Sequence, residues 1–210
     1  MEKLERKTLD TLVYERLKEM ILRGELKPGD QIIQEKIAKE LGVSRTPLRK
    51  AISQLEKEYL IKEENGKFFV RELTKDELII IFEIRALLEG LTARIVAENP
   101  DIEWLNYIES KYKSAYEKND LKEYRNTDIE FHTGLAKQAN NHILCKLTNN
   151  FWLLSVSLYQ GLIRDPKETL PEHLEIISAL KERDKERAEK AMRRHLRNTI
   201  NKIKFDVPSK

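Results

Sequence analysis

The chain has 210 residues, of which 36% are charged and 40% hydrophobic, and it contains only seven glycines and six prolines. This composition is typical of a folded, helix-rich protein and excludes a disordered chain. The net charge of +3 does not by itself indicate a nucleic-acid partner, so that case depends on where the basic residues lie. No apolar run approaches the roughly 20 residues that cross a bilayer, the N-terminus lacks a signal-peptide pattern, and the single cysteine, Cys145, excludes an internal disulfide. We therefore expect a cytoplasmic protein with no membrane partner.

The N-terminal third carries helical patterns. Apolar residues recur at helical spacing, and Gly24 and Gly42 stand where glycines end helices. Ser44 can cap the third helix, and Pro47 lies in its first turn, where a missing N–H costs nothing. The expected helices cover residues 9–23, 34–41 and 45–58.

A β-hairpin is expected after these helices. Asn65-Gly66 stands between two extended runs, and both turn residues of such a hairpin must adopt positive φ. Three helices followed by a hairpin form the winged helix-turn-helix arrangement. We therefore assign residues 1–72 to a winged helix-turn-helix DNA-binding domain.

The remainder of the chain, residues 73–210, is expected to be all-helical. Thr74 and Glu77 form a capping box at its start, and strand patterns do not recur after it. Helical patterns cover residues 75–98, 101–118, 121–139, 141–163, 168–183 and 185–205. The predicted fold class is therefore mostly α, with a six- to seven-helix bundle after the winged domain.

Arg45 and Arg49 are the main candidates for reading DNA, because they lie four residues apart and share one helix face. The N-terminal half of this helix enters the major groove, where an arginine fork can bind guanine O6 and N7. Hydroxyls and helix-terminal amides can hold phosphates, and a glycine at the hairpin tip allows close approach to the backbone. The alternative is a solvated charged face. The candidate DNA-contacting residues are Ser44, Arg45, Thr46, Pro47, Arg49, Lys50 and Gly66, with Lys67 as a further phosphate contact.

A family resemblance lies in the segment 41–52, LGVSRTPLRKAI, which is similar to the signature of the GntR family of bacterial regulators. The segment 26–30, LKPGD, fits the same family. The resemblance covers residues 9–71 and implies a winged helix-turn-helix. The family usually has Glu at the position of Lys50, where Lys adds a charge beside the groove, and Gly at that of Tyr59, where Tyr can change how the recognition helix ends and where the wing lies; the expected fold is unaffected.

Histidine and aspartate positions in the second half point to a metal site. Asp128 and His132 lie four residues apart on one helix face, while His173 and His195 lie on two later helices. Imidazole and carboxylate ligands suit a divalent transition metal ion, Zn, Ni or Mn. Taken singly, each histidine is more often a packed or surface residue, and convergence of the three helices is not shown by sequence. His142 is interpreted as a cap-region residue.

The segment 74–205 is similar to FCD, the all-helical ligand domain of FadR-type GntR regulators. The resemblance implies that Asp128, His132, His173 and His195 bind a metal ion. It is carried by Phe82-Glu83-Ile84-Arg85, Leu88-Glu89, Asp128, Phe131-His132, Ala139-Asn140, Glu172-His173 and His195.

Arg85 is the candidate effector-binding residue. It lies in the apolar stretch 78–91, where a cation needs a partner. The partner is either a neighbouring carboxylate, Glu89 or Glu83, or the carboxylate of a small organic acid that also reaches the metal. The family resemblance favours the organic acid.

The predicted function is a transcription regulator, taken as a repressor, that binds double-stranded DNA at a near-palindromic operator as a homodimer. A small organic acid bound at the metal site is expected to modulate its DNA affinity. Two alternatives are a metal that is structural or is itself the signal, and a nonspecific architectural DNA protein. A metal-dependent hydrolase is a third, but no catalytic motif supports an enzyme.

Overall fold

The computed structural model describes residues 8–158 and 162–206. The described residues divide into two compact units: residues 8–73 with the end of the seventh helix, residues 156–158, and residues 74–155 with 162–206. We call them the N-terminal unit and the helical unit. None of the described helices has the length and hydropathy that a membrane-spanning segment needs.

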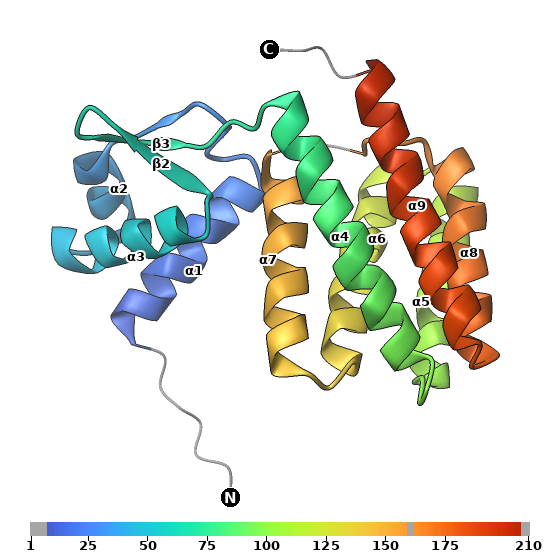
Figure 1. The fold of residues 1–210 in the computed structure, drawn as a ribbon. Helices are drawn as coiled ribbons and strands as arrows, with labels where there is room; N and C mark the ends of the chain where they lie inside the picture. Colours follow the sequence, from blue (N-terminus) through green and yellow to red (C-terminus); the bar gives the residue numbers. More distant parts are fainter. Residues whose placement is uncertain (1–7, 159–161, 207–210) are drawn as a thin grey trace, which may run out of the picture. The chain divides into compact units, whose positions relative to one another are not determined.

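The described residues of the N-terminal unit form three helices and a small antiparallel sheet (Figure 1). The sheet order is β1-β3-β2, and Ile61 of β2 pairs with Val70 of β3. The predicted helices and hairpin are confirmed, but β1 was not predicted, because two residues are too few to show alternation. The elements are α1 (Leu9–Leu22), β1 (Gln31–Ile32), α2 (Gln34–Leu41), α3 (Arg45–Lys57), β2 (Ile61–Glu64) and β3 (Lys67–Val70).

Turn and cap residues of this unit behave largely as predicted. Gly42 ends α2 with φ 66°, and Asn65 and Gly66 form the β2–β3 turn with φ 52° and 73°. Ser44 occupies the N-cap of α3, but its side chain makes no capping hydrogen bond. The capping role predicted for the Ser44 hydroxyl is therefore wrong, and the position is set by backbone conformation alone.

Tyr59 takes a backbone conformation that favours glycine. It adopts φ 61° just after α3, in the left-handed region that a side chain disfavours. The Arg71 guanidinium carbon lies 5.5 Å from the centroid of the Tyr59 ring, and the backbone N–H of Tyr59 donates to the Glu56 carbonyl. The chain therefore makes the glycine-type turn with a tyrosine.

Six helices make up the described part of the helical unit, as predicted. Several boundaries differ. The helices α4 and α8 each end two residues before the predicted end, and residues 162–163 lie outside any helix, where a helix to 163 was expected. The start of α8 is two residues early, because Asp165 caps it and Pro166 fits its first position. Thr74 and Glu77 form the predicted capping box. The helices are α4 (Lys75–Val96), α5 (Ile102–Glu117), α6 (Leu121–Gln138), α7 (His142–Leu158), α8 (Pro166–Lys181) and α9 (Lys185–Asp206).

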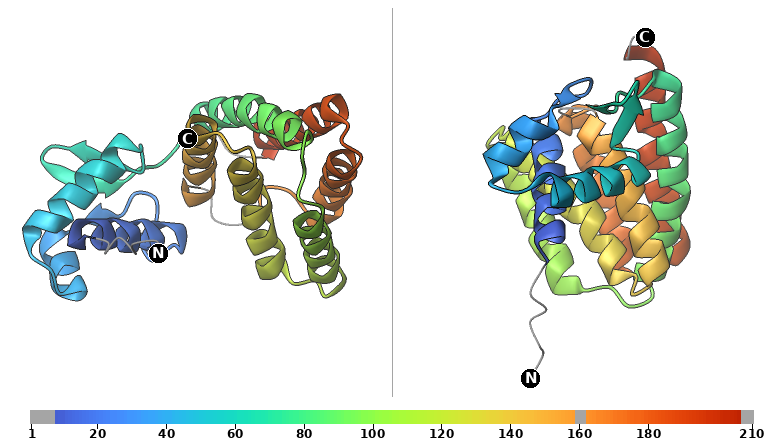
Figure 2. Two further views of the ribbon diagram at one scale, coloured as in Figure 1. Left: turned by 90° about the horizontal axis from the view of Figure 1, so that it is seen from below. Right: turned by 90° about the vertical axis from the view of Figure 1, so that its left-hand side faces the viewer.

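The helices of this unit pack around a shared interior (Figure 2). α4 and α9 run antiparallel side by side, α8 packs on α9, and α5 packs on α6 and α8. Gly90 permits the close approach of α4 and α9, since a Cβ there would lie 2.6 Å from Arg193 Cγ. Tyr112, Tyr124 and Phe131 are among the largest fully buried side chains, and they adjoin the cluster described next.

Candidate metal centre and DNA-reading surface

The exposed face of α3 carries most of the predicted DNA-contacting residues. Ser44, Arg45, Thr46, Arg49 and Lys50 are exposed on its N-terminal half. Basic and hydroxyl groups are thus presented together, as the winged helix-turn-helix requires.

Pro47 does not belong to this surface. Its side chain is buried beside Leu48 on the inner face of α3. It therefore acts in packing and helix initiation rather than as an exposed contact.

Two of the basic residues already have acidic partners. Lys50 Nζ lies 2.7 Å from Asp10 Oδ2 of α1, and Arg45 Nη2 lies 3.6 Å from Glu35 Oε2 of α2. Both pairs are well exposed, so solvent and salt weaken them and a phosphate can compete for the cations.

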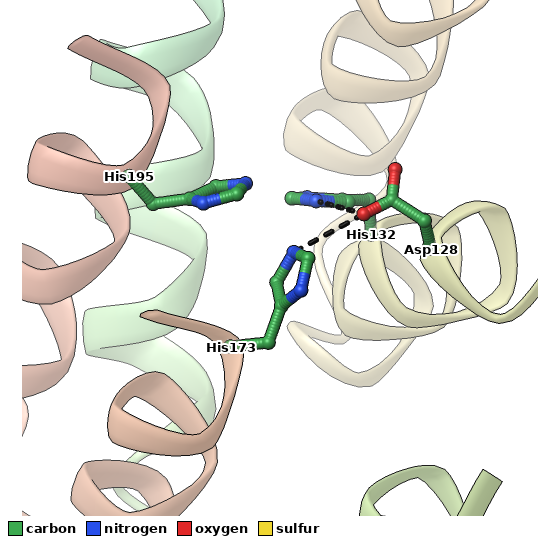
Figure 3. Close-up of side chains that lie close together, drawn as sticks. All are labelled: Asp128, His132, His173 and His195. Atoms are coloured by element: carbon green, nitrogen blue, oxygen red, sulfur yellow. Dashed lines mark ion pairs between the residues drawn. The ribbon is translucent and has the colours of Figure 1, made fainter. Parts of the chain in front are cut away.

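The four predicted metal ligands converge in the interior of the helical unit. Asp128 and His132 project from α6, His173 from α8 and His195 from α9, and they point toward one another (Figure 3). One ligand atom from each lies within 4.8 Å of all the others. The three histidines are buried and Asp128 is partly exposed. We call these residues the metal set.

In each histidine, Nδ1 is the nitrogen that points away from the centre of the metal set, and it faces a partner outside the set. His132 Nδ1 lies 2.5 Å from Glu89 Oε2, and His195 Nδ1 lies 2.7 Å from Glu172 Oε2. His173 Nδ1 lies 3.3 Å from the Tyr124 hydroxyl. Because the carboxylates accept hydrogen bonds, His132 and His195 each carry their proton on Nδ1 and direct Nε2 inward.

The pKa values of the imidazoles differ within the set. Burial works against the charged imidazole of His132, yet the carboxylates of Glu89 and Asp128 outweigh it and raise the pKa of His132 to about 9. Burial, with the nearby His173, lowers the pKa of His195 to about 4. Burial also lowers the pKa of His173. At neutral pH two imidazoles are therefore neutral.

The carboxyl group of Asp128 is ionised. Burial opposes its ionisation, but His132 and His173 outweigh that cost and hold the pKa of Asp128 well below its usual value. His132 retains a second proton at neutral pH, which it must lose to offer a lone pair to a metal.

These residues fit a metal ion. His173 Nε2 lies 3.1 Å from Asp128 Oδ1, yet it is buried and makes no well-oriented hydrogen bond. A buried nitrogen lone pair without a donor costs free energy unless something else coordinates it. Three imidazole nitrogens and one carboxylate oxygen form a set that holds first-row divalent ions. The cluster can therefore hold a metal ion.

Arg85 has the carboxylate partner that the sequence offered as one alternative. Its Nε lies 2.6 Å from Glu89 Oε1, and its Nη1 donates to Ser155 Oγ at 2.9 Å. These contacts use two of the five N–H groups of the guanidinium. Its role toward an effector stays a prediction.

Sequence reasoning missed the residues that surround the metal set. Glu89 was considered only as a partner of Arg85, and Glu172 only as the neighbour of His173. Tyr112, whose ring stacks on His173 at a centroid distance of 4.4 Å, was not singled out. A signal was present for Glu89 alone, because acidic residues are rarely buried without a specific partner.

Comparisons with known proteins agree with this architecture. The model of bacterial regulatory proteins of the gntR family matches residues 9–70, and the FCD domain model matches residues 80–198. The chain belongs to the GntR family, in the FadR-type group that carries an FCD domain.

Several HTH-type transcriptional regulators align with this chain over most of their length. The chain is 31% identical over 196 residues to the HTH-type transcriptional regulator McbR of Escherichia coli (strain K12), covering 88% of this chain and 87% of McbR. A solved structure of E. coli McbR/YncC has a TM-score of 0.79 at 27% identity, covering 95% of this chain and 98% of that chain.

Two further relatives extend the comparison. The uncharacterized HTH-type transcriptional regulator YdhC of Bacillus subtilis (strain 168) is 30% identical over 200 residues, covering 91% of this chain and 89% of YdhC. The HTH-type transcriptional repressor NanR of Klebsiella aerogenes is 27% identical over 221 residues, covering 93% of this chain and 85% of NanR. These relatives are transcriptional regulators and not enzymes. This GntR-family chain is therefore a DNA-binding regulator, and the hydrolase alternative is not supported.

A histidine substitution tests the metal set. His195→Ala removes one of the four ligands of the metal set, and we expect affinity for Zn²⁺ or Ni²⁺ to fall roughly 100-fold or more. Loss of a residue that only hydrogen-bonds to a metal ligand typically costs about 10–100-fold. The measurement is metal content after dialysis, together with competition against a chelator. The matched control is His142→Ala, because His142 is exposed at the start of α7. Equal metal content in both variants would remove His195 from the site.

Proposed function

We propose that this regulator is a repressor whose affinity for its operator changes when a small organic acid binds at a divalent metal ion held by the metal set. The observation that supports this proposal is the buried cluster of Asp128, His132, His173 and His195 in a chain with an exposed α3 surface. The metal, when bound, supplies a Lewis-acidic position that takes a carboxylate oxygen.

DNA contact is assigned to the exposed residues of α3 and to the hairpin tip. Arg45 and Arg49 are placed to contact base edges, while Ser44, Thr46 and Lys50 are placed to contact phosphates. Gly66 has no atom within 4 Å of the position that a Cβ would take, so the tip of the hairpin is free to approach the DNA backbone.

Arg85 is proposed to bind the effector carboxylate through the N–H groups that its contacts with Glu89 and Ser155 leave over. The face of α7 that carries Ser155 also carries Thr148 and Trp152, since residues at these spacings share a helix face. Thr148 Oγ1 and Trp152 Nε1 are buried and have no hydrogen-bond partner among the described residues. Unpaired buried donors favour a polar ligand next to this face.

A homodimer is proposed to use the outer face of α4. Ile80, Leu87 and Leu91 lie on one stripe of that helix and are 58%, 53% and 43% exposed. A row of exposed large apolar side chains on one helix favours an interface. An isologous contact between two copies would present two α3 helices to a near-palindromic operator.

Regulation requires that the effector bind two arrangements of the dimer with different affinity. An acid that binds both equally would change nothing, however tightly it binds. The alternative, in which the metal alone is the signal, predicts that metal changes operator affinity without any acid.

Arg49→Ala tests the DNA surface. We expect a loss of about 1–3 kcal/mol in operator binding and relaxed preference at one base position, because a bidentate contact to guanine is removed. The measurement is fluorescence anisotropy with operator and single-base variants. Arg197→Ala, which removes an exposed charge from the helical unit, is the control. An equal loss on every sequence would mean that Arg49 contacts phosphate only.

A thermal-shift screen tests the effector class. Metal-loaded protein is heated with small mono-, di- and tricarboxylates, and a chelated sample serves as control. A carboxylate at about 100 times its Kd should raise Tm by roughly 5–10 °C, and only with metal present. If no acid changes Tm while metal alone changes operator affinity, the organic effector is refuted and the metal is the signal.

Leu87→Glu tests the dimer face. A charge in the centre of the stripe should convert the dimer to a monomer, because a buried unpaired carboxylate destabilises an apolar interface. Light scattering after size exclusion measures the mass. The matched control is Leu121→Glu, since Leu121 on α6 is equally exposed at 53%. A dimeric Leu87→Glu variant would exclude this face.

A further inference from the structure

Two histidines of the metal set each donate a hydrogen bond to a carboxylate that lies outside the set. Glu89 of α4 accepts from His132 Nδ1 at 2.5 Å, and Glu172 of α8 accepts from His195 Nδ1 at 2.7 Å. In both cases the accepting carboxylate comes from a different helix than the histidine. The carboxylate therefore fixes the imidazole ring across a helix–helix contact.

Each of these carboxylates is in turn held by an arginine. Arg85 Nε lies 2.6 Å from Glu89 Oε1. Arg164 makes a bidentate contact to Glu172, with Nη1 at 2.6 Å from Oε2 and Nη2 at 2.8 Å from Oε1. The same order, arginine to glutamate to histidine, thus occurs twice. We call Arg85–Glu89–His132 and Arg164–Glu172–His195 the two arrays.

Burial distinguishes the arrays from ion pairs on the protein surface. The side chains of Arg85 and Glu89 are only 5% and 3% exposed, and those of Arg164 and Glu172 are 8% and 15% exposed. Removing such charges from water costs several kcal/mol per ion, and a well-packed apolar pair usually stabilises a core at least as well. Stability of the fold alone therefore does not account for them.

Orientation of the two histidine rings explains the buried arrays better than fold stability does. Both carboxylates accept from Nδ1, so Nε2 is the nitrogen of each ring that is left for a metal ion and is directed at the centre of the metal set, with the second proton of His132 still to be lost. A carboxylate on the outer nitrogen also makes the inner nitrogen a stronger donor to a metal. The guanidinium groups keep each carboxylate ionised and fixed in orientation, since a bidentate or cross-linked pair has little freedom.

We propose that Glu89 and Glu172 are positioning residues that set the ring orientation, proton position and donor strength of His132 and His195 for the metal ion, and that Arg85 and Arg164 hold them in place. The inference rests on the proposed metal site. The third histidine differs, because its outer nitrogen faces the neutral Tyr124 hydroxyl at 3.3 Å. Of the three histidine ligands, two are therefore strongly held and one is weakly held.

The experiment measures Co²⁺ binding to the full chain, since Co²⁺ occupies zinc-type sites and its visible bands report ligand geometry. Glu89→Gln and Glu172→Gln keep size but remove charge. We expect each to weaken Co²⁺ affinity by about 10–100-fold, measured by competition with a chelator, and to shift the visible bands. Tyr124→Phe should have a smaller effect, of less than about fivefold, because it removes only a neutral partner.

Glu109→Gln is the matched control. Glu109 is also a carboxylate of the helical unit with two cationic partners, Lys113 and Lys181, but it makes none of the contacts to the metal set. It should bind Co²⁺ as the wild type does. Equal losses in Glu109→Gln and Glu89→Gln would overturn a specific positioning role.

A double variant covers the case in which Glu89→Gln alone fails to fold. Arg85→Met with Glu89→Gln removes both charges, so no unpaired buried ion remains. It should fold, as judged by circular dichroism, and still bind Co²⁺ more weakly. If the double variant and Glu172→Gln both bind Co²⁺ with wild-type affinity, the positioning role is overturned, while the proposed metal site stands. No Co²⁺ binding by the wild type would overturn the proposed metal site itself.

Discussion

The burial of three imidazoles and a carboxylate at one point between helices is the constraint on which the helical unit depends. Apolar side chains cannot satisfy such groups, so each needs a hydrogen bond, a counter-charge or a metal. Asp128 meets His132 and His173 on the inside, while Glu89 and Glu172 meet two of the rings from the outside. The packing of α4, α6, α8 and α9 is thereby specified by polar geometry as well as by apolar contact.

This polar interior and the α3 surface belong to separate compact units of the same chain. In the proposed function, effector binding and DNA recognition are thus kept in separate units. A signal can pass between them only as a change in the equilibrium between arrangements of the protein. In the proposed function, the arrays would hold the metal set rigidly, so that binding of a small acid would move helices rather than side chains alone.

The sequence predicted the fold well because its signals are local. Helical spacing, the Asn65-Gly66 turn and the Thr74 capping box each depend on a few neighbouring residues, and all were confirmed. β1 was missed because its pairing with β3 is not local. Pro47 was placed on the wrong side of α3, although Leu48, its neighbour on the buried face, signals the inner side.

The candidate metal site was predictable only in part. The residues and their order came from a family resemblance, and their convergence depends on packing that no local pattern encodes. Glu89 lies 43 residues from His132 in sequence, so its role as the partner of that ring emerges only from the tertiary structure. Arg85 was singled out correctly as a buried cation, but only the folded structure shows that Glu89 is its carboxylate partner.

Tyr59, which makes a left-handed turn of the kind that favours glycine, has a thermal consequence. Glycine relieves the steric strain of that turn, but it also gives the unfolded chain more conformations to lose on folding. The strain is largely an energy and changes little with temperature, whereas the cost of lost conformations grows in proportion to temperature. A tyrosine at this turn is therefore a poorer choice than glycine in the cold and becomes a progressively better one as the protein is warmed.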